Sequence, residues 1–167
     1  MPGRLGGVHQ RALPQGRTMK IFLSASIRGG RHMLYVYTEI LELLQSHGHD
    51  VLSSHVADPQ LEDKESVMTE QEIYERDMNL LTRSECVIAE VSTPSIGVGY
   101  EICRALQLGL PVLCLHSPHS NVSAMILGNS SDMLTGKEYA NYQEMREKIV
   151  DFLAWQHIMP ECRIQKK

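Results

Sequence analysis

The sequence predicts an α/β fold, namely a Rossmann-like, doubly wound parallel sheet of about five strands with helices on both faces. Short apolar runs rich in β-prone residues alternate with segments of helical periodicity along the 167 residues. Such alternation is typical of parallel sheets joined by right-handed crossovers. The length and the 43% hydrophobic content fit one domain with a single core.

The N-terminal half contains the first two expected strands. Residues 20–23 (KIFL) predict a short buried strand, and residues 33–47 predict an amphipathic helix that ends at Gly48. Residues 50–54 (DVLSS) predict the second strand, with His55 at its carboxyl end. Polar residues 57–66 predict a loop, and a helix is expected over residues 69–83.

The C-terminal half contains the remaining elements. Residues 86–91 (CVIAEV) and 111–116 (PVLCLH) predict the third and fourth strands, and residues 134–139 predict a weak fifth strand. Helices are expected over residues 100–109 and 142–155, with a short one near Ala124. This pattern defines a domain over residues 19–156.

The two ends have a different composition. Residues 1–18 contain no acidic residue and several Arg, Gly and Pro, which favours a disordered tail over a targeting presequence. Residues 157–167 are expected to form a C-terminal tail.

Composition excludes several classes of function. The net charge of −4 argues against binding to nucleic acid, which requires a basic surface. The four cysteines form no CxxC pair, which argues against a zinc site and favours free thiols in a reducing compartment. No apolar run approaches the ~20 residues that span a bilayer, so we expect a soluble protein with no membrane contact.

The loop after the first strand has the parts of an anion site. Ligands of parallel α/β sheets bind outside the carboxyl ends of the strands, where "SIRGGR" (residues 26–31) lies. Glycines let backbone N–H groups approach an oxyanion, and arginine adds a charge-assisted hydrogen bond. The segment matches neither GxxxxGK[ST] nor GxGxxG. It predicts a phosphate cradle, with a flexible solvated turn as the alternative.

The loop after the third strand ends in an acid. In "SIGVGYE" (residues 95–101), Glu101 follows two glycines and falls in the first turn of the expected helix. Because a helix N-terminus stabilises a carboxylate, we expect Glu101 to be ionised at neutral pH and to suit a nucleophile. A simple interaction with the helix dipole is the alternative.

Asp77 is the second unusual acid, because its spacing from Tyr74 and Leu81 puts it on the apolar face of its helix. A carboxylate there is costly unless it is paired or used. Pairing with Arg28, Arg76 or His55 is one explanation. If Asp77 lies near Glu101, the like charge makes it retain a proton, as a general acid must, and two carboxyl groups in different environments are typical of glycosyl chemistry.

Several motifs together resemble a known family. They are "SIRGGR" at 26–31, "HV" at 55–56, "EQEIYERD" ending at Asp77, "VIAEVSTPSIGVGYE" at 87–101 and "VSAMI" at 122–126. Residues 19–155 resemble the 2'-deoxynucleoside 5'-phosphate N-hydrolases of the nucleoside 2-deoxyribosyltransferase superfamily. The resemblance implies hydrolysis of a deoxynucleoside monophosphate, 5-hydroxymethyl-dUMP among others, to free base and 2-deoxyribose 5-phosphate.

The resemblance also implies roles for individual residues. Glu101 would attack the anomeric carbon, and Asp77 would assist proton transfer. His55 would lie near the base, and Ser123 would reach the phosphate in the partner subunit of a homodimer, with Ala124 and Met125 beside it. Phe22 replaces a tyrosine near the sugar, which weakens the expected preference for deoxyribose. The other expected substrate contacts, chiefly to the phosphate, are Ser26, Ile27, Arg28, Gly29, Gly30, Arg31, Ser95 and Gly97.

The resemblance implies no cofactor and no metal, and a cytoplasmic or nuclear location. The alternatives are a nucleoside deoxyribosyltransferase, a ribonucleotide (CMP-type) N-hydrolase and a nucleotide-binding sensor without turnover. The sequence does not specify the preferred base.

Overall fold

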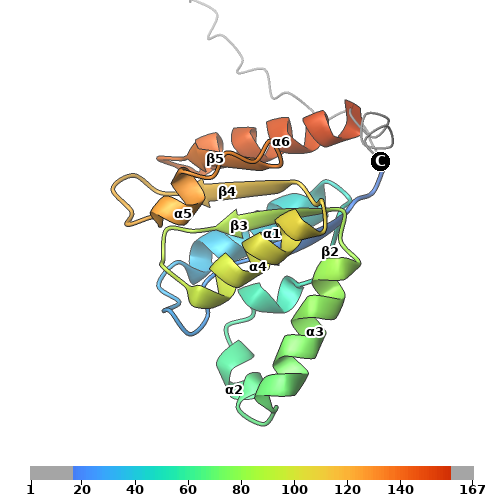
Figure 1. Cartoon of the computed structure of the whole chain (residues 1–167), viewed down its shortest axis with the longest axis vertical. Coiled ribbons are helices and arrows are strands. Elements are labelled where there is room, and N and C mark those ends of the chain that lie inside the picture. Colours follow the sequence, from blue (N-terminus) through green and yellow to red (C-terminus); the bar gives the residue numbers. More distant parts are fainter. Residues whose placement is uncertain (1–16, 159–167) are drawn as a thin grey trace, which may run out of the picture.

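Five parallel strands form the centre of the protein in the computed structural model, which describes residues 17–158. Their order is β2-β1-β3-β4-β5, and each neighbouring pair is parallel (Figure 1). This arrangement confirms the predicted fold class. The strands are β1 (Lys20–Ser24), β2 (Asp50–Val51), β3 (Cys86–Glu90), β4 (Val112–His116) and β5 (Leu134–Glu138).

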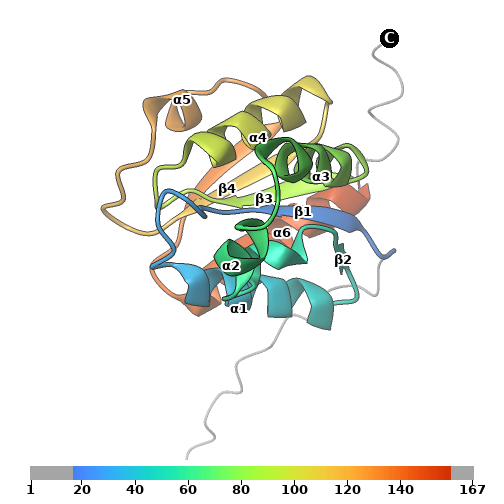
Figure 2. The same ribbon diagram turned by 90° about the horizontal axis from the view of Figure 1, so that it is seen from below.

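Helices cover both faces of the sheet (Figure 2). Helix α1 (Leu34–Ser46) and helix α6 (Tyr142–Ile158) pack on one face, and α3 (Glu70–Thr82) and α4 (Ile96–Gln107) pack on the other. The N-terminal end of α3 projects from the sheet beside α2 (Leu61–Glu65), and α5 (Ala124–Leu127) follows β4 (Figure 1). The expected N-terminal tail lies almost wholly outside the described residues, and α6 extends two residues into the expected C-terminal tail.

Helix α4 begins one turn earlier than expected. It begins at Ile96 rather than at Tyr100, and the Ser95 side chain caps it by accepting a hydrogen bond from the backbone N–H of Val98. Glycine weakens helices but does not forbid them, and the cap compensates in the first turn. Gly97 and Gly99 are therefore helical, and Glu101 lies in the second turn instead of the first.

The second strand is shorter than expected, because the Ser53 side chain takes over its pairing with β1. The buried hydroxyl of Ser53 accepts a hydrogen bond from Leu23 N–H at 2.7 Å and donates one to the Leu23 carbonyl at 2.8 Å. The backbone then turns into a 3-10 helix, η1 (Ser54–Ala57). His55 therefore lies in this helical turn, not at the end of a strand.

We predict that Ser53→Ala lowers the free energy of unfolding by about 1–3 kcal/mol, because it leaves a buried N–H and a buried carbonyl without partners. Chemical denaturation monitored by circular dichroism measures the change. Ser66→Ala is the control, since that exposed hydroxyl contacts only the Asp63 carbonyl and its loss should cost under about 0.5 kcal/mol. Equal stability of the two variants would contradict the role of Ser53.

Candidate active site

A cavity of about 510 Å³ lies beyond the carboxyl ends of β1 and β3. The strand order reverses between these two strands, and sheets of this order bind ligands at that switch point. Segments distant in sequence line the cavity: the loop after β1, the end of α2, one face of α3, and the start of α4. The lining residues are Ala25, Ile27, Arg28, Gly29, Glu65, Ile73, Asp77, Pro94, Ser95, Ile96, Gly97, Val98 and Glu101.

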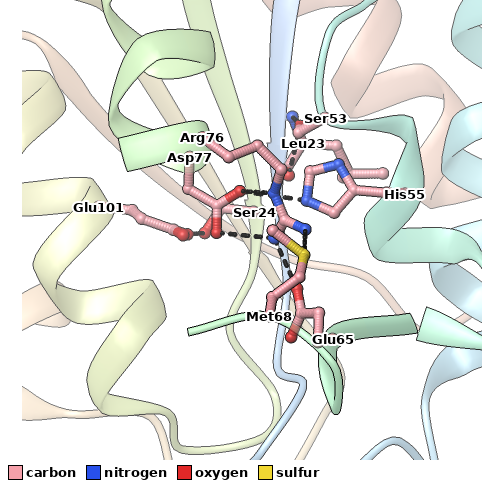
Figure 3. Close-up of polar contacts among 9 residues, drawn as sticks. All are labelled: Leu23, Ser24, Ser53, His55, Glu65, Met68, Arg76, Asp77 and Glu101. Carbon is pink, nitrogen blue, oxygen red and sulfur yellow. Dashed lines mark hydrogen bonds and ion pairs between the residues drawn. The ribbon is translucent and has the colours of Figure 1, made fainter. Parts of the chain in front are cut away.

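Glu101 lies at the inner end of this cavity. Its Oε2 accepts a hydrogen bond of 2.5 Å from Ser24 Oγ, at the end of β1 (Figure 3). Burial is the main cause that raises the pKa of Glu101 to about 7; the negative charge of Asp77 acts in the same direction, and the Ser24 hydrogen bond and the charge of Arg76 only partly oppose the shift. The expectation of a fully ionised Glu101 at neutral pH was therefore wrong, because loss of solvent outweighs any benefit from the helix N-terminus, which lies more than a turn away.

Asp77 is held by two basic side chains. Arg76 Nε donates to Asp77 Oδ1 at 2.9 Å, and His55 Nε2 lies 3.2 Å from the same oxygen (Figure 3). Burial favours the protonated acid, but hydrogen bonds and charge interactions with His55 and Arg76 outweigh it and lower the pKa of Asp77. The expectation that Asp77 retains a proton beside Glu101 was therefore wrong. Asp77 therefore forms the ion pairs with Arg76 and His55 that the sequence offered as one explanation, and it also lines the cavity.

The two carboxyl groups thus have different pKa values. The raised pKa belongs to Glu101 and not to Asp77, which is the reverse of the prediction. The pKa of Asp77 is lowered, and the pKa of Glu101 is close to neutral. Near pH 7 Asp77 is therefore ionised, and Glu101 is able both to hold and to release a proton. An ionised carboxylate and a carboxyl group that can lose its proton face the same space, which is a suitable arrangement for covalent catalysis with proton transfer.

The two glycine-containing loops are in contact at the cavity mouth. A Cβ on Gly29 would lie 2.6 Å from the Pro94 carbonyl oxygen and 2.6 Å from Ser26 Oγ, so only glycine fits there without a shift. Gly30 has a φ of +116°, a conformation that side chains rarely adopt. Ser26 Oγ is buried and, within residues 17–158, has no hydrogen-bond partner.

Arg28 lies at the exposed rim of the cavity. Its Nη1 donates to both carboxylate oxygens of Glu70 at 2.9 and 3.1 Å. Glu70 is the first residue of α3, so this ion pair links the loop after β1 to the helix that carries Asp77.

Five expected site residues from the first half of the chain are outside the cavity lining, namely Phe22, Ser26, Gly30, Arg31 and His55. The guanidinium of Arg31 donates to the Val56 carbonyl at 2.8 Å and so holds the turn that carries His55. Gly30 forms the turn before Arg31 through a hydrogen bond from its N–H to the Ile27 carbonyl. Phe22 is only 1% exposed and packs in the core beneath α3 and α4.

The expected residues of α5 lie apart from this cavity. Ser123 caps α5, and Ser123 and Met125 line a second, largely apolar cavity of about 850 Å³ beside α4. None of Ser123, Ala124 and Met125 lines the cavity that contains Glu101.

Sequence reasoning missed the residues that support the acids. Ser24 binds Glu101, and Glu65 binds Arg76 Nη2 at 2.5 Å, which fixes the guanidinium beside Asp77 (Figure 3). A polar residue at the end of a buried strand was the available signal for Ser24. Glu65 carried no signal, because it lies in a polar segment that was expected to be a loop.

No group of three or more His, Cys, Asp or Glu side chains in residues 17–158 could hold a metal ion. None of the helices in this part of the chain has the length and apolar character needed to cross a membrane.

We predict that Glu101→Gln stabilises the protein at alkaline pH. A carboxyl group whose pKa rises from 4.5 when unfolded to about 7 when folded binds its proton more tightly in the folded state, so wild-type stability falls as pH rises between these values. The neutral amide avoids this loss, on the order of 3 kcal/mol by pH 8. Urea denaturation at pH 5 and pH 8 measures it. A variant without the gain at pH 8 would contradict the raised pKa.

Known proteins of similar fold and sequence place these residues in context. The solved structure of a Clostridium botulinum CMP N-glycosidase aligns with a TM-score of 0.60 at 20% identity, over 80% of this chain and 98% of the other, which shows a shared fold. A protein of Methanococcoides burtonii named "Putative 2'-deoxynucleoside 5'-phosphate N-hydrolase 1" is 63% identical over 112 residues, 67% of this chain and 92% of its own.

A 5-hydroxymethyl-dUMP N-hydrolase of Rattus norvegicus is 46% identical over 112 residues, which are 65% of this chain and 68% of the rat protein. The family model described as nucleoside 2-deoxyribosyltransferase matches residues 21–152, which include every residue lining the Glu101 cavity. The resemblance drawn from the motifs is thus confirmed, and the chain belongs to the nucleoside 2-deoxyribosyltransferase family.

Proposed function

We propose that this protein hydrolyses the N-glycosidic bond of 2'-deoxynucleoside 5'-monophosphates, giving free base and 2-deoxyribose 5-phosphate. The observation that carries the proposal is the pair of acids, Glu101 and Asp77, which line one cavity and whose pKa values are shifted in opposite directions. The names of the Methanococcoides burtonii and rat relatives support the substrate class. The reaction needs no cofactor and no metal in this mechanism.

The 5'-phosphate binds at the mouth of the cavity, between the two contacting loops. Backbone N–H groups at Gly29 and Gly97, together with the start of α4, supply donors and positive helix-end charge. The hydroxyl groups of Ser26 and Ser95 add hydrogen bonds. Arg28 exchanges Glu70 for the phosphate, an exchange that costs little because the existing ion pair is exposed. Phosphate binding orients the anomeric carbon toward Glu101.

Bond cleavage uses both acids. Glu101 transfers its proton to Asp77, and its carboxylate attacks the anomeric carbon as the bond to the base breaks and an oxocarbenium-like centre develops. Asp77 passes the proton to the departing base. Water then attacks the glycosyl-enzyme, which releases the sugar phosphate and restores Glu101, while Asp77 receives a proton from the water. Ser24 holds Glu101 in position, and Arg76 and His55 hold Asp77.

The base lies at the end of the cavity nearest His55. Arg31 supports the His55 turn, and Ile27 supplies an apolar contact on the opposite loop. Phe22 packs behind the site without a hydroxyl group that could bind the sugar. Strict rejection of ribose is thus not built into this position. The name of the rat relative favours 5-hydroxymethyl-dUMP as one substrate.

The functional unit is a homodimer in which α5 of one protomer completes the partner's site. Apolar side chains near α4 and α5 are strongly exposed, with Ile96 95% exposed and Met125 82% exposed. Exposed apolar surface of this kind is typical of a protein interface. Ser123, Ala124 and Met125 then contact the neighbouring phosphate site. The free thiols Cys103 and Cys114 suit the reducing cytoplasm or nucleus.

A panel of deoxy- and ribonucleoside 5'-monophosphates, each scored for released base by chromatography, tests the function. We expect base release from deoxynucleotides, with kcat/KM falling as pH increases through about 7, because a deprotonated Glu101 leaves Asp77 no proton to pass to the departing base. Glu101→Gln should bind nucleotide and release no base, and residual turnover would contradict its role. Base release from CMP alone would favour a ribonucleotide N-hydrolase. Exchange of the base with an added free base would favour a deoxyribosyltransferase, and thermal stabilisation by nucleotide without base release would favour a sensor.

Mixing two inactive variants tests the shared site. Ser123→Ala lacks the contact across the interface, and Glu101→Gln lacks the nucleophile. A mixed dimer contains one complete site, so we expect the mixture to exceed the summed activity of the separate variants after subunit exchange. Glu101→Gln mixed with Asp77→Asn is the matched comparison, since both changes affect one protomer's own acids. Monomeric protein by sedimentation would contradict the dimer.

A further inference from the structure

Glu90 is a buried acid with no part in the mechanism described above. It is the last residue of β3, is fully buried, and does not line the cavity of Glu101. One carboxylate oxygen accepts hydrogen bonds from the Ser92 hydroxyl and from Tyr139 Oη, the latter at 3.0 Å, and the other accepts from Ser92 N–H at 3.2 Å. Three donors thus converge on one carboxyl group.

The hydrogen bonds continue to the neighbouring strands. The Ser92 hydroxyl, which donates to Glu90, accepts a hydrogen bond from Ser117 N–H at 2.8 Å. Ser117 directly follows β4, and Tyr139 directly follows β5. The carboxyl ends of three adjacent strands, β3, β4 and β5, are therefore linked through Glu90 and Ser92.

The segment fixed in this way leads directly to the proposed phosphate site. Residues 91–95 join β3 to α4, and Val91 N–H is held by the Leu115 carbonyl at 2.8 Å. Pro94 contacts the Gly29 loop, and Ser95 caps α4, the helix that carries Glu101. A shift of Ser92 would move Pro94 and Ser95 together, because only Thr93 lies between Ser92 and Pro94.

We infer that Glu90 is a positioning residue that anchors the 91–95 turn and so sets the place of Ser95 and the start of α4. The inference rests on the proposed function for its effect on catalysis. Glu90 does not touch substrate; it acts through Ser92. Glu90 thus supports the proposed active site from outside the cavity lining.

The chemistry of the cluster favours a carboxylate over an amide. All three hydrogen-bonding groups donate, and two carboxylate oxygens accept them without conflict. In Glu90→Gln one oxygen becomes an NH₂ group, which must face either Ser92 N–H or the hydroxyl pair. Against Ser92 N–H the NH₂ group faces another donor, and against the two hydroxyl groups it makes both accept and leaves their own protons without an acceptor, so the turn should shift away.

The test compares Glu90→Gln and Tyr139→Phe with Ile149→Val. Ile149 is 1% exposed on α6, on the opposite face of the sheet from α4, and its change lowers stability without touching the turn. We expect Glu90→Gln to raise KM for a deoxynucleoside 5'-monophosphate about tenfold, with kcat within about threefold, because phosphate binding depends on the turn. Tyr139→Phe, which removes one of the three donors, should shift KM in the same direction by less.

Amide hydrogen exchange of residues 92–98 provides a readout that needs no turnover. Faster exchange there in both cluster variants, and not in Ile149→Val, supports the anchor. If Glu90→Gln and Tyr139→Phe have the same KM and the same exchange rates as Ile149→Val, the anchor is refuted. If Glu90→Gln does not fold, the comparison of Tyr139→Phe with Ile149→Val decides. Absence of base release by wild-type protein would instead refute the proposed function, and the exchange data would still judge the anchor.

Discussion

The central constraint in this protein is that two acidic side chains share a cavity that cannot hold two negative charges cheaply. Arg76 and His55 favour the ionised form of Asp77, so the loss of solvation falls on Glu101. Within residues 17–158, the hydrogen bond that stabilises the ionised form of Glu101 comes from Ser24. The surrounding arrangement, from the cap of α4 to the ion pair between Arg76 and Glu65, serves to hold this pair in place. Stability lost by burying Glu101 is the usual cost of a prepared reactive group.

The sheet brings these groups together by its strand order alone. Ser24 ends β1, and Glu101 lies on the helix that follows β3, the strand paired with β1. The crossover through α1, η1 and α3 returns to the same edge and adds His55 and Asp77. No single segment contains the site, which is why each loop taken separately gave only a weak indication of an anion-binding function.

The sequence was sufficient for the fold class and for singling out Asp77 and Glu101, which the structure places in one cavity, because both depend on periodicity and on where parallel strands end. It was insufficient for the pKa values of the two acids. These depend on burial and on partners such as Ser24, Arg76 and His55, whose contacts cannot be read from the spacing of residues in the sequence. The start of α4 was misplaced by one turn because glycines at 97 and 99 favour a loop until the Ser95 cap is known. Similarly, no local pattern indicates that the Ser53 side chain replaces a strand's backbone.

Under the proposed function, the ion pair between Arg28 and Glu70 gives the entrance of the cavity a selectivity of its own. An uncharged nucleoside offers Arg28 nothing in exchange for the Glu70 carboxylate, whereas a phosphate dianion does. Ligands are thereby sorted at the rim before any chemistry begins. Because both the resident and the incoming charge pair are exposed there, dissolved salt weakens both, and the discrimination between phosphorylated and unphosphorylated ligands declines as ionic strength rises.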